Sequence, residues 1–357
     1  MQIVFLIKPF SVQMYSYVKN AYELLGTEDI SAIENENTTD YENRVVYVCK
    51  DICQDFVNTD LYKKNKKNIK SIKVILTNPW CIYEIMNLEK NLDKPQKINQ
   101  KFIDELIVHK ESDQVSILKN SIFNVALNGY NVLKVQDQVA SSIHLQYLSI
   151  YSSTNFLSRL RNTLNTIFHL HVVEVDSIYS YINQYHTDEK NVNQLKIIIE
   201  DQGLDLSYVY QNKNIATLFI KSGYLHIMDK IKELLHIDNT ILDKILKSKS
   251  LNMTTDKTKM TYDKNLSNIW LDLDQETRSK IDDTLDRELS NIKTQIRDFV
   301  DNVGTDLIQK DVHVNIYCMD ENVFSTALIL AGSIKNDAYI LDKLLTNESN
   351  IFTKKIF

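Results

Sequence analysis

The amino-acid sequence predicts an α/β protein, in which strand-like and helix-like segments alternate along 357 residues. Three observations lead to this prediction. Short runs of β-branched and aromatic residues recur, apolar residues at helical spacing lie between several of them, and an Asn-Gly pair follows an alternating segment. Strands that alternate with helices are typical of α/β folds, and the hairpin signal predicts an antiparallel-rich insertion at about residues 81–153.

The predicted strands are enriched in Ile, Val, Leu, Tyr and Phe. They are Ile3–Ile7, Arg44–Cys49, Ile72–Leu76, Phe123–Leu127, Ile143–Ile150, Val172–Val175, Ile197–Ile199, Leu206–Tyr210, Asn214–Ile220 and Val312–Cys318. Pro79 ends the third of these, because proline cannot donate to a sheet. Asn128-Gly129 predicts a tight turn after the fourth, and Asp201-Gln202-Gly203 predicts another hairpin turn.

Helices are predicted where apolar residues recur at a period of 3.6. Ser153 or Thr154 is expected to cap a helix with the apolar residues Phe156, Leu157, Leu160, Leu164, Ile167 and Phe168 on one face. Further helices are expected at Gly223–Leu235, at Ile241–Leu246 and over the long periodic stretch from Ile281 to Phe299, which closes near Gly304. Two polar stretches, Glu34–Asn43 and Ser248–Asn265, are predicted to be loops.

Composition excludes several classes of protein. The chain holds Gly 6 and Pro 3, whereas average usage at this length would give roughly 25 Gly and 18 Pro. Collagen-like and proline-rich chains are excluded, and neither GxGxxG nor GxxxxGK[ST] occurs. A formal net charge of -6 disfavours nucleic acid as a partner. The four unpatterned cysteines fit a reducing compartment, and no window approaches 18 apolar residues.

Three short motifs have ordinary structural explanations. His169-Leu170-His171 lacks a third ligand that would complete a metal site, and Cys49-x-x-x-Cys53 is expected to pack rather than to bind metal or react. The lysine-rich run from Lys63 to Lys73 is expected to be a solvated face. Its alternative is a docking surface for an acidic partner or for membrane headgroups.

The most informative stretch surrounds a predicted hairpin. Asp201, Gly203 and Ser207 follow the pattern D-x-G-x-x-x-S, and Gly223 opens the next helix. Backbone N–H groups and a hydroxyl in such a hairpin can hold a nucleotide phosphate, while the aspartate orients Mg²⁺ or water. A hairpin that simply needs a turn explains the same residues, so both interpretations stay open.

This stretch resembles the second phosphate loop of the actin-like ATPase fold, in the bacterial FtsA and PilM branch. Val74–Trp80 resembles the strand and Pro-Trp pair that close the first core half, and Val125–Tyr130 resembles a hairpin of the extra subdomain of that branch. Ser149–Val175 resembles the return to the core. Trp270, the Ile281–Phe299 helix and Val312–Cys318 resemble the closing half.

The resemblance implies an actin-like (ribonuclease H-like) fold of two halves with an inserted extra subdomain of the FtsA and PilM type. The expected divisions are a first core half at 1–80, the extra subdomain at 81–153, a return to the first half at 154–190, and a second half at 191–357 with a variable loop at 248–265. The implied nucleotide-binding residues are Asp201, Gly203, Ser207 and Gly223.

Departures from the family pattern shape the functional expectation. Residues 2–12 contain neither Asp nor Gly, so the first phosphate loop is missing, and no Gly-Gly pair follows Val312–Cys318. The expectation is a non-catalytic or weakly nucleotide-binding scaffold similar to PilM, and ATP with Mg²⁺ is the cofactor that stays open. The alternatives are an ATP-binding, filament-forming protein similar to FtsA in cell division, and a structural component that kept only the fold.

The resemblance also implies partners. A PilM-like scaffold would bind a short cytoplasmic peptide of an inner-membrane protein and link it to a type IV pilus machine or a similar assembly. Residues 118–150 are the expected partner surface, with Leu127, Asn128, Gly129 and Tyr130 as candidate contacts. The implied location is the cytoplasm, peripheral to the inner membrane. Self-association and a weak membrane contact of the tail Asn350–Phe357 are further expectations.

Overall fold

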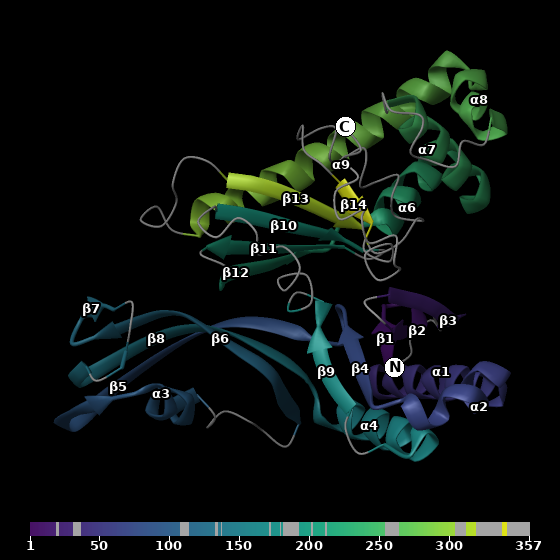
Figure 1. Cartoon of the computed structure of the whole chain (residues 1–357). Helices are drawn as coiled ribbons and strands as arrows, with labels where there is room; N and C mark the ends of the chain where they lie inside the picture. Colours follow the sequence, from purple (N-terminus) through teal and green to yellow (C-terminus); the bar gives the residue numbers. More distant parts are fainter. Residues whose placement is uncertain are drawn as a thin grey trace. The chain divides into compact units, whose positions relative to one another are not determined.

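The computed structural model describes residues 1–18, 21–30, 37–107, 114–132, 135–136, 138–170, 173–178, 180, 193–200, 203–210, 213–253, 264–303, 312–318 and 338–340. The chain divides into two compact units, Met1–Lys190 with Asn212–Ile215, and Asn191–Gln211 with Ala216–Phe357. Figure 1 labels the elements of both units. Each unit contains a mixed sheet with helices packed against it.

The first unit is organised around a five-stranded sheet in the order β3-β2-β1-β4-β9. Its strands are β1 (Gln2–Ile7), β2 (Ser11–Val18), β3 (Ala21–Asp29), β4 (Ser71–Leu76) and β9 (Val173–Ser177). The first three strands form an antiparallel meander, whereas β1, β4 and β9 run parallel. The carboxyl ends of the parallel strands therefore meet at one edge of the sheet.

Two long helices pack on one face of this sheet. They are α1 (Thr38–Asn58) and α4 (Thr154–Phe168), and the short elements α2 (Asp60–Asn65) and η1 (Lys66–Asn68) connect α1 to β4. Alternate residues of β1, such as Ile3, Phe5 and Ile7, contribute to one core with Phe56 of α1 and Leu160 of α4. Helix and sheet bury their apolar faces against each other here.

The prediction of a strand at Arg44–Cys49 is wrong, because these residues lie inside α1. The β-branched residues there favour a strand, but the buried residues Val45, Cys49, Ile52 and Phe56 recur at helical spacing. Burial of that face outweighs the weak local propensity. The predicted loop Glu34–Asn43 is also wrong in part, since α1 begins at Thr38, while residues 34–36 lie outside the described residues.

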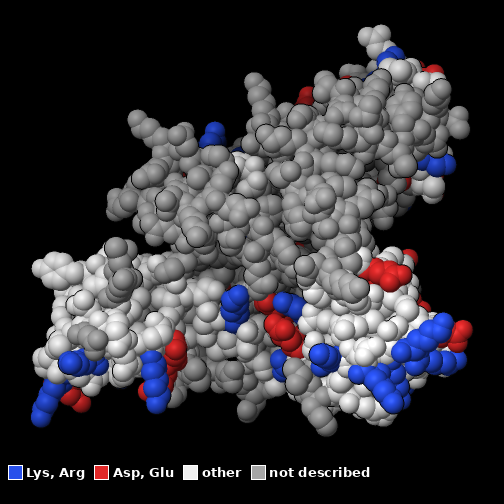
Figure 2. Space-filling view, viewed as in Figure 1, with Lys and Arg blue, Asp and Glu red and all other residues white. Residues whose placement is uncertain are grey.

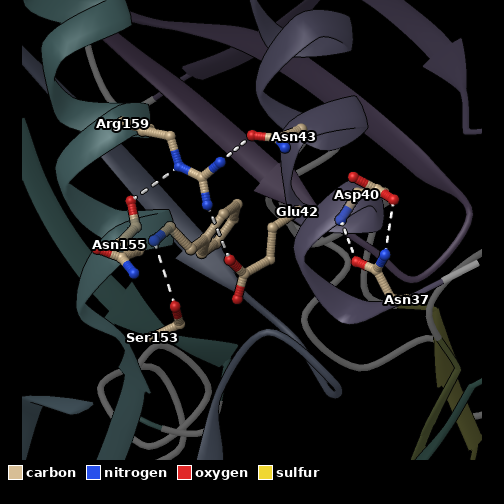
Figure 3. Close-up of polar contacts among 8 residues, drawn as sticks. Asn37, Asp40, Glu42, Asn43, Ser153, Asn155 and Arg159 are labelled. Atoms are coloured by element: carbon tan, nitrogen blue, oxygen red, sulfur yellow. Dashed lines mark hydrogen bonds and ion pairs between the residues drawn. The ribbon is translucent and has the colours of Figure 1, made fainter. Parts of the chain in front are cut away.

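A polar clasp joins α1 to α4 (Figure 3). Arg159 donates from Nη2 to Oε2 of Glu42 at 3.2 Å, from Nη1 to Asn43 and from Nε to the carbonyl oxygen of Asn155. The Glu42 side chain is only 11 % exposed, so Arg159 supplies the charge that a buried carboxylate requires. These contacts hold α1 and α4 together on one face of the sheet.

Side chains at the starts of these helices satisfy their first N–H groups. Asn37 Oδ1 accepts from Asp40 N at 2.9 Å, and Ser153 Oγ accepts from Phe156 N at 3.3 Å (Figure 3). The predicted cap at Ser153 and the apolar face of the helix that follows it are confirmed. His169 ends that helix in a left-handed conformation, with φ 54.

A second sheet in the same unit is wholly antiparallel, in the order β5-β8-β6-β7. Its strands are β5 (Ile82–Ile98), β6 (Val115–Leu127), β7 (Tyr130–Asn131) and β8 (Gln138–Ser153), and α3 (Gln100–Ile107) packs on one face. Ile103 and Ile107 of α3 share a core with Leu145 and Tyr147 of β8. The Asn128-Gly129 hairpin prediction is confirmed by the pairing of Leu127 with Tyr130.

The second unit repeats the strand pattern of the first, with the order β12-β11-β10-β13-β14. Its strands are β10 (Asn193–Ile199), β11 (Leu204–Tyr210), β12 (Lys213–Ile220), β13 (Val312–Cys318) and β14 (Ala338–Ile340). β10 pairs antiparallel with β11 and parallel with β13, as β1 does with β2 and β4. This repetition of one sheet in two units is the main architectural feature.

The described helices of the second unit are α6 (Tyr224–Leu235), α7 (Asn239–Met253), α8 (Lys264–Asp272) and α9 (Gln275–Asn302). Figure 1 shows α9 running alongside the sheet. The loop predicted at Ser248–Asn265 is wrong at both ends, because α7 extends to Met253 and α8 begins at Lys264, while residues 254–263 lie outside the described residues. Among the described residues, none of the helices is long and apolar enough to cross a membrane.

Candidate functional site

The predicted phosphate hairpin is the turn between β10 and β11. Ile199 pairs with Leu204, and Glu200 N donates to the carbonyl oxygen of Gly203 at 2.8 Å. The hairpin prediction is therefore confirmed as a fold feature. Asp201 and Gln202, at the tip of this turn, lie outside the described residues, so the site is built below from its neighbours Gly203, Ser207 and Gly223.

Gly203 has a packing reason to be glycine. A Cβ added at this position would lie 2.4 Å from Phe219 Cζ and 2.5 Å from the carbonyl oxygen of Ile220, both on β12. Such distances are far shorter than carbon atoms tolerate, and one of the two neighbours is backbone. The close approach of β12 therefore explains Gly203 without a ligand.

Ser207 lies on a polar face of the sheet of the second unit. It is fully buried, and it pairs with the buried Lys196 across the β10–β11 ladder. Within the described residues, Ser207 Oγ has no hydrogen-bond partner. Directly opposed residues have Cβ atoms roughly 5 Å apart, so the Ser207 and Lys196 side chains leave the sheet next to each other. Together they could donate hydrogen bonds to an anionic group.

The same face carries further polar side chains, because successive residues of a strand alternate between faces. The buried polar members of this face are Gln194 and Lys196 of β10, Asp205 and Ser207 of β11, and Tyr317 of β13, and the buried Ile198 and Val209 lie among them. The opposite face is apolar and includes Leu195, Ile197, Ile199, Leu204 and Leu206. Burial lowers the pKa of Lys196 to about 8, because desolvation disfavours the charged ammonium.

Gly223 lies at the start of α6, next to this hairpin. It is the N-cap residue of the helix and makes no side-chain cap, and Tyr224 N lies 3.5 Å from the carbonyl oxygen of Glu200. The fold therefore brings Gly223 close to the turn that contains Gly203, as the sequence hypothesis requires. Ser207 lies further along β11 on the polar face, so the described residues do not place all three at one point.

The corresponding turn of the first sheet, Lys8-Pro9-Phe10 between β1 and β2, is occupied by contacts within the chain. Trp80 Nε1 donates to the carbonyl oxygen of Lys8 at 2.9 Å, the Tyr41 hydroxyl donates to that of Pro9, and Ile30 N donates to that of Phe10. Pro9 has no N–H, and Lys8 N already donates to the carbonyl oxygen of Ser11 at 2.9 Å. This turn offers few backbone donors to a phosphate.

A group of buried polar side chains at the carboxyl edge of the first sheet was missed by sequence reasoning. Lys8, Thr77, Asp176 and Ser177 follow or end the parallel strands β1, β4 and β9, and all are buried. The signal that could have found them is a polar residue directly after a buried strand. Within this group, Thr77 Oγ1 donates to the carbonyl oxygen of Ile7 at 3.2 Å, and Ser177 N donates to Asp176 Oδ1 at 2.8 Å.

Asp176 has a cation from its own chain. Lys73 Nζ lies 3.8 Å from Oδ2 of Asp176 and 3.8 Å from Oε1 of Glu174. The Lys73 and Asp176 side chains are nearly buried, at 13 % and 12 % exposure, so the attraction is weakly screened. In the described part of the chain, no group of three or more His, Cys, Asp and Glu side chains could hold a metal ion.

The candidate partner residues form a tight turn at one end of the antiparallel sheet. Asn128 and Gly129 both have positive φ, 53 and 83, as a type I′ turn requires. Asn128 Oδ1 accepts from Ser141 N at 2.8 Å and from Ser141 Oγ at 3.0 Å, which ties the turn to β8. Leu127 is buried, whereas Tyr130 is 77 % exposed. Of the four residues, Tyr130 therefore presents the large accessible surface.

The cysteine and histidine motifs singled out in the sequence lie at ordinary structural positions in the described residues. Cys49 and Cys53 are buried on one face of α1, and burial raises the pKa of both thiols above their usual range. Thiols of this kind are poor nucleophiles and poor metal ligands. His169 is the left-handed residue that ends α4, while His171 lies outside the described residues.

Comparison with known proteins identifies the fold. No family model and no curated protein matches the sequence. Among solved structures, a PilM–PilN type IV pilus biogenesis complex matches with TM-score 0.58 and 9 % identity, over 99 % of this chain and 93 % of that chain. MreB 5 of Spiroplasma citri bound to AMPPNP matches with TM-score 0.48 and 10 % identity, over 99 % and 96 %. The ethanolamine utilization protein EutJ from Carboxydothermus hydrogenoformans matches with TM-score 0.45 and 6 % identity, over 96 % and 86 %.

The match to the PilM–PilN complex extends along nearly all of both chains. The chain therefore has the actin-like ATPase fold in a divergent form, so the predicted actin-like α/β fold is confirmed, while the inserted extra subdomain stays a prediction. A likeness at 9 % sequence identity shows the fold and not the function, because one fold supports many functions. What this chain binds has to be argued from its own residues.

Proposed function

We propose that this chain is a non-catalytic scaffold similar to PilM. It would bind a short cytoplasmic peptide of an inner-membrane protein and link that protein to a type IV pilus machine or a similar assembly. The observation that carries the proposal is the turn Lys8-Pro9-Phe10, which supports structure rather than phosphate binding. A likeness in fold to a PilM–PilN complex agrees with the proposal.

The physical argument concerns backbone donors. A hairpin that holds a phosphate of a nucleotide needs preorganised backbone N–H groups. In the first hairpin, Pro9 carries no N–H and Lys8 N is used within the turn. The indole of Trp80 and the hydroxyl of Tyr41 hold the turn carbonyls in place. Rearranging this turn to cradle a phosphate would break those contacts, so tight binding of ATP is not expected.

A second candidate function is an ATP-binding, filament-forming protein similar to FtsA. The observation that favours it is the pairing of Lys196 with Ser207 on the polar face of the sheet of the second unit. Both side chains are buried, and a hydroxyl next to a lysine ammonium can hold a phosphate. This alternative predicts that the chain binds Mg-ATP and that it pellets with increasing protein concentration.

We place the peptide site on the antiparallel sheet, within residues 118–150. This sheet would be the extra subdomain, inserted at 81–153 between parts of the first core half at 1–80 and 154–190, with the second half at 191–357. On the face opposite α3, Asn124 Nδ2 donates to Gln146 Oε1 and Gln146 Nε2 donates to Asn87 Oδ1, each at 3.0 Å. Such a row of amides can exchange hydrogen bonds with a peptide.

The test captures the partner and then maps it. The full chain is used to retain proteins from detergent-solubilised membranes, and a synthetic peptide of the retained protein's cytoplasmic segment is titrated into the purified chain. We expect saturable binding that is weakened at least tenfold by Tyr130→Ala or by Asn124→Ala combined with Gln146→Ala. The matched control is Tyr47→Ala on α1, whose side chain is 63 % exposed.

Deleting residues 81–153 is a poor test, because Leu148 and Ile150 of β8 belong to the core of the first sheet. The surface variants avoid that problem. Peptide binding that is unchanged by all the sheet variants would contradict the proposed site. Concentration-dependent pelleting that requires Mg-ATP, without any captured membrane protein, would favour the filament-forming alternative.

A further inference from the structure

A surface rich in lysine, which the scaffold function leaves unused, lies at the end of α1. The basic segment, Lys63–Lys70, contains Lys63, Lys64, Lys66, Lys67 and Lys70, and all five side chains are exposed. Asp60 is the one carboxylate between residues 60 and 70, so this stretch has a net charge of +4 in a chain whose net charge is -6. Figure 2 shows lysine and arginine side chains gathered over α1 and α2.

The basic segment is firmly attached to the first unit. Tyr62 and Ile69 lie in the core, 6 % and 7 % exposed, and the Tyr62 ring lies 5.5 Å from that of Phe56 and 6.1 Å from that of Phe168 between centroids. Lys70 N donates to the carbonyl oxygen of Met1 at 3.1 Å. The backbone that carries the lysines is therefore fixed and does not need to be ordered before binding.

Carboxylates of the chain compensate little of this charge. Lys63 lies 3.7 Å from Asp60, but both side chains are largely exposed, and an exposed pair of this kind contributes little. Lys66 lies 6.0 Å from the centroid of the Tyr62 ring. By contrast, the exposed lysines of β5 and α3 alternate with carboxylates, as in the pair Lys101–Glu105. The concentration of positive charge is thus particular to the basic segment.

We propose that the basic segment binds the anionic headgroups of a lipid membrane. A row of exposed lysines suits a diffuse negative surface, because an ammonium is a point charge without the fork geometry of arginine. Leu61, on the same short helix, is 40 % exposed and can insert beside the headgroups. The rest of the chain carries a net negative charge, which favours an approach to an anionic surface through this region.

The inference is independent of the scaffold function, because it needs no partner protein. The test is flotation of the purified full chain with phosphatidylcholine vesicles that contain about 30 % phosphatidylglycerol, compared with phosphatidylcholine alone. We expect binding to the anionic vesicles at low salt that disappears between about 50 mM and about 500 mM salt, as the Debye length shortens. Each lysine near the surface contributes roughly a fivefold factor in affinity.

Two matched variants assign the binding to residues. The variant Lys63→Gln, Lys64→Gln, Lys66→Gln, Lys67→Gln should lose at least tenfold in vesicle affinity. The control Lys90→Gln, Lys94→Gln, Lys97→Gln, Lys101→Gln removes the same charge from exposed sites on β5 and α3 and should bind as the wild type does. Thermal unfolding of both variants checks that they are folded.

Three results of the vesicle experiments would overturn the proposal. They are the absence of flotation with anionic vesicles at low salt, an equal loss of affinity in both variants, and wild-type affinity in the first variant, which would assign the binding elsewhere in the chain. Binding to soluble polyglutamate without binding to vesicles would also overturn it and would indicate an acidic protein partner instead.

Discussion

The indole N–H of Trp80 donates to the carbonyl oxygen of Lys8 at 2.9 Å, across 72 residues of sequence. Trp80 also packs against the rings of Tyr41 and Phe156, at 5.0 Å and 5.4 Å between centroids. Through this residue, the turn after β1, the segment after β4 and the start of α4 are held together. The turn Lys8-Pro9-Phe10 is thereby held in place by contacts within the chain.

Trp80→Phe tests this role of the indole. The variant keeps an aromatic ring but leaves the buried Lys8 carbonyl without its donor, so we expect the free energy of unfolding to fall by about 1–2 kcal/mol in urea titrations. Tyr130→Phe is the control, since it removes a hydroxyl from a side chain that is 77 % exposed. Equal stability of Trp80→Phe and the wild type would contradict the account of this turn.

Gly203→Ala tests whether packing alone requires this glycine. A Cβ there would lie 2.4 Å from Phe219 and 2.5 Å from the Ile220 carbonyl oxygen, so we expect a loss of about 1–3 kcal/mol in stability. Truncating the ring in Gly203→Ala with Phe219→Ala should not rescue it, because the Ile220 carbonyl is backbone. Urea titration measures both variants, and full stability of Gly203→Ala would refute the packing explanation.

Asn128 combines a left-handed backbone with side-chain hydrogen bonds to Ser141, and two variants separate the contributions. Asn128→Gly keeps the backbone conformation and loses the hydrogen bonds, whereas Asn128→Ala loses both. We expect stability to decrease in the order wild type, Asn128→Gly, Asn128→Ala, with about 1 kcal/mol between the two variants. If Asn128→Ala were as stable as Asn128→Gly, the φ of 53 would carry no cost.

Lys196 predicts a pH dependence of stability. Its pKa is about 8 in the folded chain, below the ordinary value of 10.5, so the unfolded chain binds more protons between these values and stability contributed by this group rises with pH. The penalty of burying the ammonium is full below about pH 8 and is relieved toward about pH 10. Lys196→Met should therefore gain stability relative to the wild type at pH 7.

The measurement is the difference in the free energy of unfolding between Lys196→Met and the wild type across that range. This difference should shrink as pH rises from about 7 to about 10. The exposed Lys221 of the same unit supplies the control, and Lys221→Met should show no such change. A difference in unfolding free energy that is constant with pH would show that burial does not lower the pKa of Lys196.

The sequence predicted the parts of the fold that depend on local signals. Ser153 was expected to cap a helix, and its Oγ accepts from Phe156 N. Asn128-Gly129 was expected to close a hairpin, and Leu127 pairs with Tyr130. Both are decided by short-range chemistry that a single sequence displays.

Long-range packing accounts for what the sequence did not predict. The run Arg44–Cys49 has strand propensity but is helical, because its buried residues Val45 and Cys49 join the core that α1 shares with the first sheet. The polar group at Thr77 and Asp176 was missed, since only the parallel pairing of β1, β4 and β9 brings those strand ends together. Ser207 was proposed as a phosphate ligand, and its neighbour Lys196 becomes visible only through the β10–β11 register.

The thermal stability of the full chain in the presence of Mg-ATP tests the central claim most directly. The midpoint of unfolding is compared at about 5 mM Mg-ATP with Mg²⁺ alone, because a ligand that binds the folded state raises this midpoint. For a scaffold whose first hairpin turn is held by contacts within the chain, we expect no change in the midpoint of unfolding. A saturable rise in the midpoint that Asp201→Ala or Ser207→Ala abolishes would contradict it and would establish a nucleotide-binding protein.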